Sequence, residues 1–165
     1  MNLNNAKRSE DTEQIAVVMW AQYHLADYPE LKWLHHIPNG GSRNKLEAVK
    51  MKQMGVKAGV SDLFLPCARG IYCGLYIEMK YNQGRVQESQ KDFLTEMTKR
   101  GYYTAICYTA EDAVAVLKEY CELLTEGTWK MREDGIYKNV CYGAAMAEEN
   151  CSIWKDGEVK RPKWR

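Results

Sequence analysis

Hydrophobic residues recur at helical spacing over 9–27, the first long apolar pattern along the chain. Ser9 is a suitable N-cap, and the acidic residues after it complement the positive end of the helix dipole. The pattern predicts Val17 and Trp20 on one side of the helix and, on the other, an apolar stripe of Ile15, Val18, Met19, Gln22 and Ala26. Because this helix is apolar nearly all round, we expect it to be buried on more than one face.

Two later stretches have the apolar composition of strands, and a short connection containing Pro66 and Gly70 joins them. The predicted order is helix, helix, strand, strand, helix, strand, helix. The ranges are 9–27, 42–54, 61–67, 74–80, 87–100 and 102–109, followed by a helix that opens at Thr109. We expect the first two strands to pair like a hairpin, and the last crossover favours parallel pairing. The predicted fold class is α/β, with a restriction-endonuclease-like core in which helices flank a small mixed sheet.

Helical and strand patterns weaken beyond Gly127, which indicates one main domain. The 165 residues, 45% of them hydrophobic, suffice for one domain with a real core and are too few for two of ordinary size. We therefore predict a domain over 1–126 and a C-terminal extension over 127–165 that is weakly structured or forms a small ornament. No segment approaches the roughly 20 uninterrupted apolar residues of a membrane span, so we expect a cytoplasmic protein without a membrane partner.

The formal net charge of +1 excludes general electrostatic attraction to nucleic acid, so any basic surface must be local. Positive charge is concentrated between residues 43 and 57, where Glu47 is accompanied by Arg43, Lys45, Lys50, Lys52 and Lys57. Beside a Gly-rich turn these residues could bind DNA phosphates, or they could form an ordinary solvated helix face. Charge alone does not separate the two interpretations.

The cysteines and histidines carry weaker signals. Six cysteines are spread without a C-x-x-C pair, which favours buried, reduced thiols. A zinc site built from Cys141, Cys151 and a histidine would match no familiar ligand spacing. Adjacent histidines in a strand point to opposite faces, and we interpret His35 and His36 as structural.

The strand predicted over 74–80 ends with polar residues at alternate positions. Side chains alternate across a strand, so Glu78 and Lys80 share one face. If the preceding strand lies alongside, Asp62 brings a second carboxylate close to Glu78. Two carboxylates and a main-chain carbonyl suit Mg²⁺ or Mn²⁺, and a nearby lysine can stabilise charge on a phosphate. These are the components of a nuclease, although an E-x-K pattern also occurs at ordinary solvated strand ends.

Two further polar residues lie on apolar helix faces. Glu13 shares its side of the first helix with Val17 and Trp20, where it could hold a metal-bound water or simply complement the helix dipole. Gln90 lies in an apolar stripe with Phe93, and a buried amide there would need hydrogen-bond partners from the sheet. A half-exposed glutamine near a helix end is the alternative.

Several motifs follow one another along the predicted domain: Glu13-Gln14, IPNGG at 37–41, GVKAGVSDLFLP at 55–66, GLYIEMK at 74–80, ESQKDF around Gln90, and GYYTAICYTAEDAVAVLKEY at 101–120. In this order they resemble a VRR-NUC domain, a family of the PD-(D/E)XK nuclease superfamily. The resemblance covers roughly residues 9–123 and rests on the ordered set rather than on the E-x-K pattern alone.

The resemblance implies a catalytic set of Glu13, Asp62, Glu78, Lys80 and Gln90. In this set Asp62 and Glu78 bind the catalytic metal together with the main-chain carbonyl of Met79, and Lys80 activates water or stabilises the transition state. Glu13 would hold a metal-bound water, and Gln90 would brace the site. Ser61 stands where many members have proline, at a position that shapes the turn and ligates no metal.

The same resemblance implies a stand-alone protein of viral (phage) or bacterial type, acting as a homodimer on branched DNA such as four-way (Holliday) junctions. It implies no organic cofactor and, for a viral protein, the host cytoplasm. The main hypothesis is a divalent-metal-dependent DNA endonuclease. The alternatives are a non-catalytic DNA-binding module of the same fold and a sequence-specific restriction-like endonuclease. The intact polar set argues against the first, and the lack of a separate recognition domain argues against the second.

Overall fold

The computed structural model describes residues 8–38, 45–123, 129–131, 137–139 and 151–160. Its centre is a six-stranded sheet in the order β1-β2-β3-β4-β7-β8, formed by His35–His36, Leu63–Leu65, Leu75–Met79, Tyr103–Cys107, Ser152–Lys155 and Glu158–Lys160. The helices are α1 (Glu10–Tyr23), α2 (Lys45–Gln53), α3 (Glu88–Lys99) and α4 (Ala110–Glu122), with a short 3₁₀ helix at Pro29–Trp33. A separate two-stranded sheet pairs β5 (Trp129–Met131) with β6 (Tyr137–Asn139). The predicted α/β fold class is confirmed.

Strand pairing at the centre of the sheet confirms both predicted connections. β2 and β3 are antiparallel, with Leu63 opposite Ile77. β3 and β4 are parallel, with Glu78 beside Ile106, and α3 forms the crossover between them. The first residues of β2 and the last residues of β3 therefore meet at one end of the sheet.

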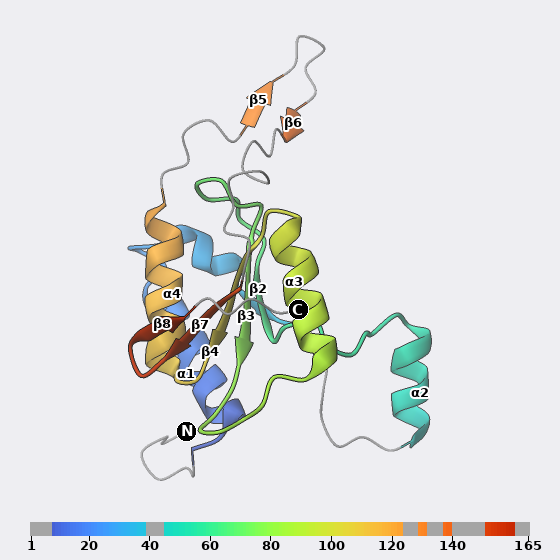
Figure 1. The fold of residues 1–165 in the computed structure, drawn as a ribbon. Coiled ribbons are helices and arrows are strands. Elements are labelled where there is room, and N and C mark those ends of the chain that lie inside the picture. The colour runs from blue at the N-terminus through green and yellow to red at the C-terminus, as the bar shows by residue number, and fades with distance from the viewer. Residues whose placement is uncertain (1–7, 39–44, 124–128, 132–136, 140–150, 161–165) are drawn as a thin grey trace.

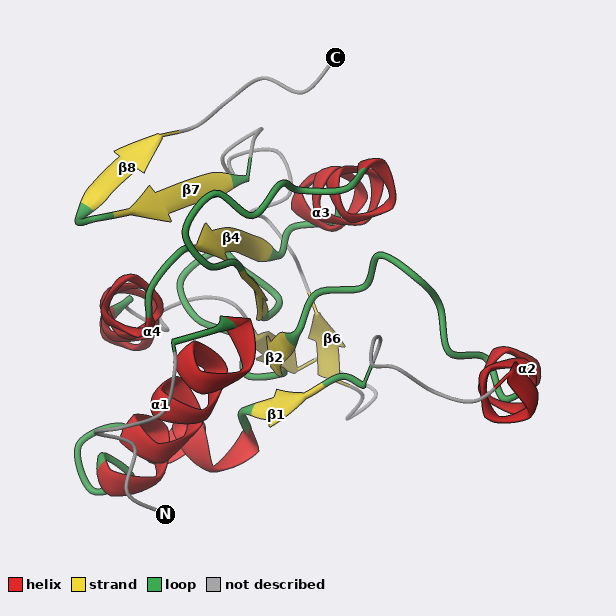
Figure 2. Cartoon of the chain, turned by 90° about the horizontal axis from the view of Figure 1, so that it is seen from below, coloured by secondary structure: helices red, strands yellow, loops and turns green. Residues whose placement is uncertain are grey.

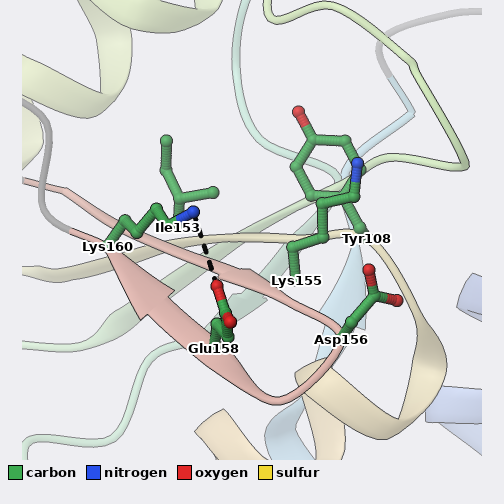
Figure 3. Close-up of a pocket in the computed structure, with 6 residues that line it drawn as sticks. All are labelled: Tyr108, Ile153, Lys155, Asp156, Glu158 and Lys160. Carbon is green, nitrogen blue, oxygen red and sulfur yellow. Dashed lines mark ion pairs between the residues drawn. The ribbon is translucent and has the colours of Figure 1, made fainter.

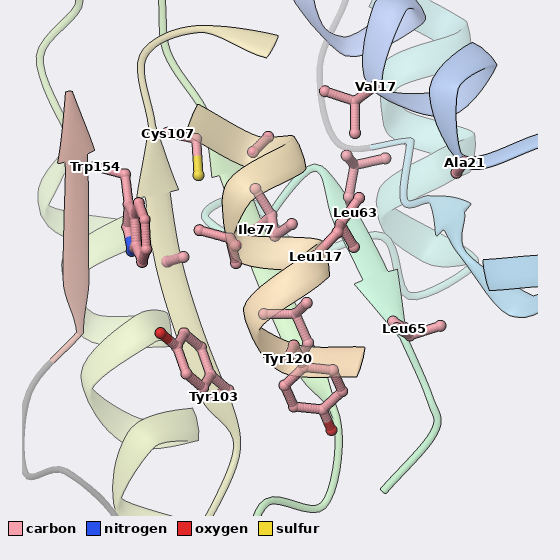
Figure 4. Close-up of a cluster of buried hydrophobic side chains, with 14 of the residues drawn as sticks. Val17, Ala21, Leu63, Leu65, Ile77, Tyr103, Cys107, Leu117, Tyr120 and Trp154 are labelled. Atoms are coloured by element: carbon pink, nitrogen blue, oxygen red, sulfur yellow. The ribbon is translucent and has the colours of Figure 1, made fainter. Parts of the chain in front are cut away.

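Helices cover both faces of this sheet (Figures 1 and 2). α1 and α4 lie on one face, where Val17 and Leu117 pack with apolar residues of β2, β3 and β4 in the main core (Figure 4). α3 lies on the other face, where Leu94 packs with Ile106 and Cys151 in a smaller core. Glu78 belongs to the α3 face because it stands beside Ile106. α2 stands away from the sheet in both views.

α1 buries one side, the side to which the helical pattern assigns Glu13 and Val17. Glu13, Val17 and Ala21 are buried, whereas Ile15 and Met19 of the predicted stripe are 42% and 37% exposed. The expectation of burial on more than one face was wrong. The buried side contacts the sheet and α4, and it includes Glu13, whose carboxylate has partners that make its burial favourable. The helix also ends at Tyr23 rather than at 27.

The segment after residue 127 contributes two strands to the main sheet that were not predicted. β7 pairs in parallel with β4, and Trp154 enters the main core. β8 then folds back on β7 through Asp156 and Gly157, both with positive φ, as a tight hairpin turn requires. Strands this short have too few residues for a periodic signal, so the sequence did not predict them. The proposed division at residue 127 stays a prediction.

Candidate active site

The register of β2 against β3 places the two predicted metal carboxylates together. Because Leu63 lies opposite Ile77, Asp62 lies level with Glu78. The Asp62 carboxylate accepts a hydrogen bond from the Met79 amide at 2.8 Å, and the Asp62 carbonyl is 2.9 Å from Nδ1 of His36. These contacts fix the segment before β2 against the end of β3.

Gly59 lets the loop that leads to Asp62 approach α3 closely. Its φ is +87°, and a Cβ atom there would collide with the carbonyl oxygen of Ser89. Ser89 precedes Gln90, so this close approach sets the loop against the turn of α3 that faces the site. A glycine at this position is therefore a structural requirement of the site.

Lys80 and Gln90 converge on one oxygen of Glu78. Lys80 Nζ donates to Glu78 Oε1 at 2.7 Å and to the Met79 carbonyl at 2.9 Å. The side-chain amide of Gln90 also donates to Glu78 Oε1, and its own oxygen accepts the Gln87 amide at 2.9 Å. The structure thus brings Asp62, Glu78, Lys80 and Gln90 together as expected.

The other oxygen of Glu78 is the unusual feature of this cluster. Glu78 is fully buried and Lys80 is 5% exposed, yet Glu78 Oε2 has no hydrogen-bond partner among the described residues. A buried carboxylate oxygen without a partner is costly. Because Glu78 also lies level with Asp62, a second carboxylate, we interpret its Oε2 as an atom that binds a ligand.

Burial, with the charge of Asp62 as a second cause, raises the pKa of Glu78 to about 7, although Lys80 opposes the shift. Burial also raises the pKa of Asp62 against the opposing hydrogen bond from the Met79 amide. For Lys80, burial is the largest single influence and lowers the pKa, but the charge of Glu78, its hydrogen bond and the charges of Glu10 and Asp62 together make the net shift upward. Two destabilised carboxylates side by side would both be stabilised by a cation.

The donor set fits a hard divalent cation. Asp62 and Glu78 supply carboxylate oxygens, and the Met79 carbonyl already attracts the positive charge of Lys80. Mg²⁺ typically binds one or two carboxylates and keeps several waters, so two carboxylates suffice for it. The described residues contain no cluster of three or more histidine, cysteine, aspartate or glutamate side chains that could form a metal site. A site here would therefore rely on two carboxylates and a main-chain carbonyl.

Glu13 lies at the contact between α1 and α4 instead of with this cluster. Arg8 donates to it through Nε at 2.6 Å, and the Ala110 amide donates to its Oε2 at 2.8 Å. The hydrogen bond from Arg8 lowers the pKa of Glu13, against the upward effect of burial. The expectation that Glu13 faces the metal is therefore corrected, because both of its oxygens are engaged elsewhere.

Glu10 is the α1 carboxylate that approaches the cluster. Its Oε2 lies 3.8 Å from Lys80 Nζ, and its side chain is 48% exposed. From its position in the sequence, Glu10 is expected only to complement the helix dipole. The order of the acidic residues along α1 does not show which of them turns toward β3, because the helix is apolar nearly all round.

The basic residues predicted to contact DNA are only partly described. Arg43 and the side chain of Lys45 lie outside the described residues. Lys50 and Lys52 on α2, and Lys57 after it, are exposed. Exposure is compatible with phosphate contact and with a solvated face, so their role stays a prediction.

The predicted zinc alternative gains no support from the described residues. Cys141 lies outside them, and Cys151 is buried in the smaller core with Leu94 and Ile106. Burial raises the pKa of the Cys151 thiol to about 12, which keeps it protonated.

The described helices include none that is long and apolar enough to cross a membrane.

The mixed sheet with acidic and basic groups gathered where β2 begins and β3 ends is the architecture of a nuclease-type domain. The family model for the VRR-NUC domain matches residues 8–111, and the chain therefore belongs to the VRR-NUC family. A solved structure described as a VRR_NUC domain protein is 31% identical, with a TM-score of 0.62, and the match covers 72% of this chain and 93% of that one. A search of curated proteins finds no match. Membership implies a nuclease-type domain with DNA as its substrate.

Proposed function

We propose that this protein is a divalent-metal-dependent DNA endonuclease. The observation that carries the proposal is the fully buried Glu78, whose Oε2 has no partner among the described residues and which lies level with Asp62. Such a pair is unfavourable as a purely structural element and useful for holding a cation. Asp62, Glu78 and the Met79 carbonyl would hold Mg²⁺ or Mn²⁺, which when bound would polarise the phosphodiester.

The surrounding residues have distinct roles in this proposal. Lys80, positioned by Glu78 and the Met79 carbonyl, donates to a phosphate oxygen as negative charge develops. Gln90 holds Oε1 of Glu78 and so fixes the direction of Oε2. We assign Glu10, in place of Glu13, as the α1 carboxylate that orients the attacking water beside Lys80.

The substrate that we propose is branched DNA such as a four-way junction, and the acting unit is a homodimer. The resemblance to the family supports this assignment. The number of sites supports it as well, because one domain has one metal site and paired cuts on two strands need two copies of the domain. The exposed Lys50, Lys52 and Lys57 would contact phosphates outside the site and position the duplex arms.

The test uses labelled four-way junction, flap, single-stranded and linear duplex DNA with Mg²⁺, Mn²⁺ or EDTA. Wild type is compared with Asp62→Ala and Glu78→Gln. Glu96→Gln is the matched control, because Glu96 is a half-exposed carboxylate on α3 that pairs with Arg100. We expect metal-dependent cutting of branched substrates by wild type and the control, and none by the two site variants.

Each other outcome has a specific meaning. Cutting that persists in Asp62→Ala or Glu78→Gln would remove that residue from the metal site. Junction binding in Mg²⁺ without any product would indicate a non-catalytic DNA-binding module. Cuts at one fixed sequence regardless of DNA shape would indicate a restriction-like endonuclease.

A further inference from the structure

A second polar site lies beside the candidate active site, between the β7–β8 hairpin and the residue that follows β4 (Figure 3). It is a pocket of about 430 Å³ lined by Tyr108, Ile153, Lys155, Asp156, Glu158 and Lys160. None of these residues belongs to the metal site described above. The volume is in the range of pockets that hold small organic groups.

The hairpin that forms one wall of this pocket is firmly anchored. The backbone amides of Asp156 and Gly157 donate to the carboxylate of Asp112 at 3.2 and 3.0 Å. Asp112 is itself buried in the first turn of α4. Because a buried side chain clamps the turn, the pocket is formed before any ligand arrives.

The pocket is connected to the active site through the turn that follows Lys80. Tyr108 donates its hydroxyl to the Gly84 carbonyl at 3.1 Å, and Lys155 Nζ donates to the Asn82 carbonyl at 3.4 Å. A Cβ atom on Gly84 would lie 3.0 Å from Glu10 Oε1, so the other side of this turn borders the site. A DNA strand with its scissile phosphate at Lys80 would have an adjacent nucleotide near the pocket.

The side chains that line the pocket suit the base of that nucleotide better than its phosphate. Two lysines and two acidic residues balance in charge, and Lys160 lies 3.4 Å from Glu158, so a phosphate would gain little net attraction. Lys155 Nζ lies 5.0 Å from the centre of the Tyr108 ring. A flat, uncharged base with donors and acceptors on its edge matches an aromatic ring surrounded by ammonium and carboxylate groups.

We propose that this pocket binds an unpaired nucleobase of the strand being cut, next to the scissile phosphate. The inference rests on the proposed function, because a nuclease site at Lys80 is what brings a strand past this turn. It deepens that function by giving a physical reason for selectivity: a base can enter the pocket only where the DNA is single-stranded or branched. Stacking on an aromatic ring changes affinity by about tenfold per base.

Binding is measured by fluorescence anisotropy in EDTA, so that no strand is cut. The probes are a labelled oligothymidylate and a strand of equal length with abasic residues, which keeps the phosphates and removes the bases. The variants are Tyr108→Leu, which removes the ring, and Tyr108→Phe, which keeps it. Lys155→Ala tests the pocket without altering the ring. Its matched control is Lys118→Ala, an exposed lysine that lies 5.6 Å from the Trp20 ring on the α1–α4 side of the sheet.

We expect wild type, Tyr108→Phe and Lys118→Ala to bind the base-containing strand about tenfold more tightly than the abasic strand. In Tyr108→Leu and Lys155→Ala this preference should largely disappear. Equal binding of the two strands by wild type would overturn the proposal. The proposal would also be overturned if Lys155→Ala and a folded Tyr108→Leu both kept the full preference for the base-containing strand.

A parallel cleavage assay of wild type with Mg²⁺ or Mn²⁺ separates this proposal from the proposed function. Metal-dependent cutting without any base preference would leave the nuclease standing and remove the base pocket. Base preference that depends on Tyr108 and Lys155, with no cutting of any DNA, would support the pocket and remove the nuclease assignment.

Discussion

Two buried glutamates of this fold, Glu13 and Glu78, have opposite environments. Glu13 is 4% exposed, and both of its oxygens accept hydrogen bonds from Arg8, while Oε2 also accepts one from the Ala110 amide. Glu78 is fully buried, and one of its oxygens has no partner among the described residues. The pKa of Glu13 is lowered chiefly by its hydrogen bond to Arg8, whereas burial and the charge of Asp62 raise that of Glu78.

The difference separates a carboxylate that stabilises the fold from one that is available for chemistry. Glu13 joins the start of α1 to the first residue of α4, so its charge is balanced within the protein. Lys80 and Gln90 donate to Oε1 of Glu78, and a bound cation would balance the charge at its Oε2. Burial alone would have placed both in the same category, and only their partners distinguish them.

The largest expected effect is on cleavage by Glu78→Gln. The change keeps the shape of the side chain but removes the charge that attracts the cation, so single-turnover cleavage should fall by about a thousandfold. Mg²⁺ should also raise the Tm of wild type and not that of the variant, because a ligand stabilises only the state that binds it. An equal Mg²⁺-dependent Tm rise in both proteins would contradict the comparison.

Glu13→Ala should act on stability instead. Loss of a buried carboxylate that caps the Ala110 amide and pairs with Arg8 should lower the free energy of unfolding by about 2 kcal/mol. Urea unfolding measures this change, and cleavage below the Tm should stay within about threefold of wild type because α1 retains Glu10. A loss of cleavage as large as that of Glu78→Gln, in a protein that is folded at the assay temperature, would return Glu13 to the active site.

Gln90→Ala should have an intermediate effect on cleavage alone. Gln90 contacts Glu78 without taking part in the reaction, and removal of such a bracing contact typically lowers metal affinity or activity by about tenfold. A Mg²⁺ titration should show that the loss is mostly in metal affinity. An unchanged titration curve would mean that Lys80 alone positions the carboxylate.

The smallest expected effect is on the pH dependence of the free energy of unfolding. The pKa of Glu13 lies below its ordinary value of 4.5, so its contribution to stability is present above that pH and is lost as the pH falls through the folded-state pKa. The stability gap between wild type and Glu13→Gln should therefore narrow as the pH falls below 4.5 and through the folded-state pKa. Urea unfolding at several pH values measures it, and a gap that widened toward acid would reverse the assigned sign.

Much of the fold could be predicted from local sequence patterns. The strands at 61–67 and 74–80, the helix at 87–100 and the strand at 102–109 all have apolar patterns long enough to identify, and their pairing followed from the connections. Asp62, Glu78 and Lys80 could be grouped because strand alternation and register are nearly deterministic. Gln90 followed from its position in an apolar helix stripe.

The errors arose where a distant partner decides the outcome. Nothing within α1 shows that Arg8 and the start of α4 neutralise Glu13, so its carboxylate was expected at the metal and Glu10 was overlooked. β7 and β8 are four and three residues long, too short for a pattern, and become strands only because β4 offers an edge for pairing. Such features depend on tertiary contacts rather than on local propensity.

The placement of β7 beside β4 also has a consequence for the order of folding. β4 is synthesised more than forty residues before its partner, since Ala105 pairs with Ser152, and Trp154 completes a core whose other members are already present. Until β7 arrives, one edge of the growing sheet exposes unpaired backbone groups, which favour association with other chains. A pairing this distant in sequence makes folding slower, so the last strands of the sheet govern how long the nascent protein is prone to aggregate.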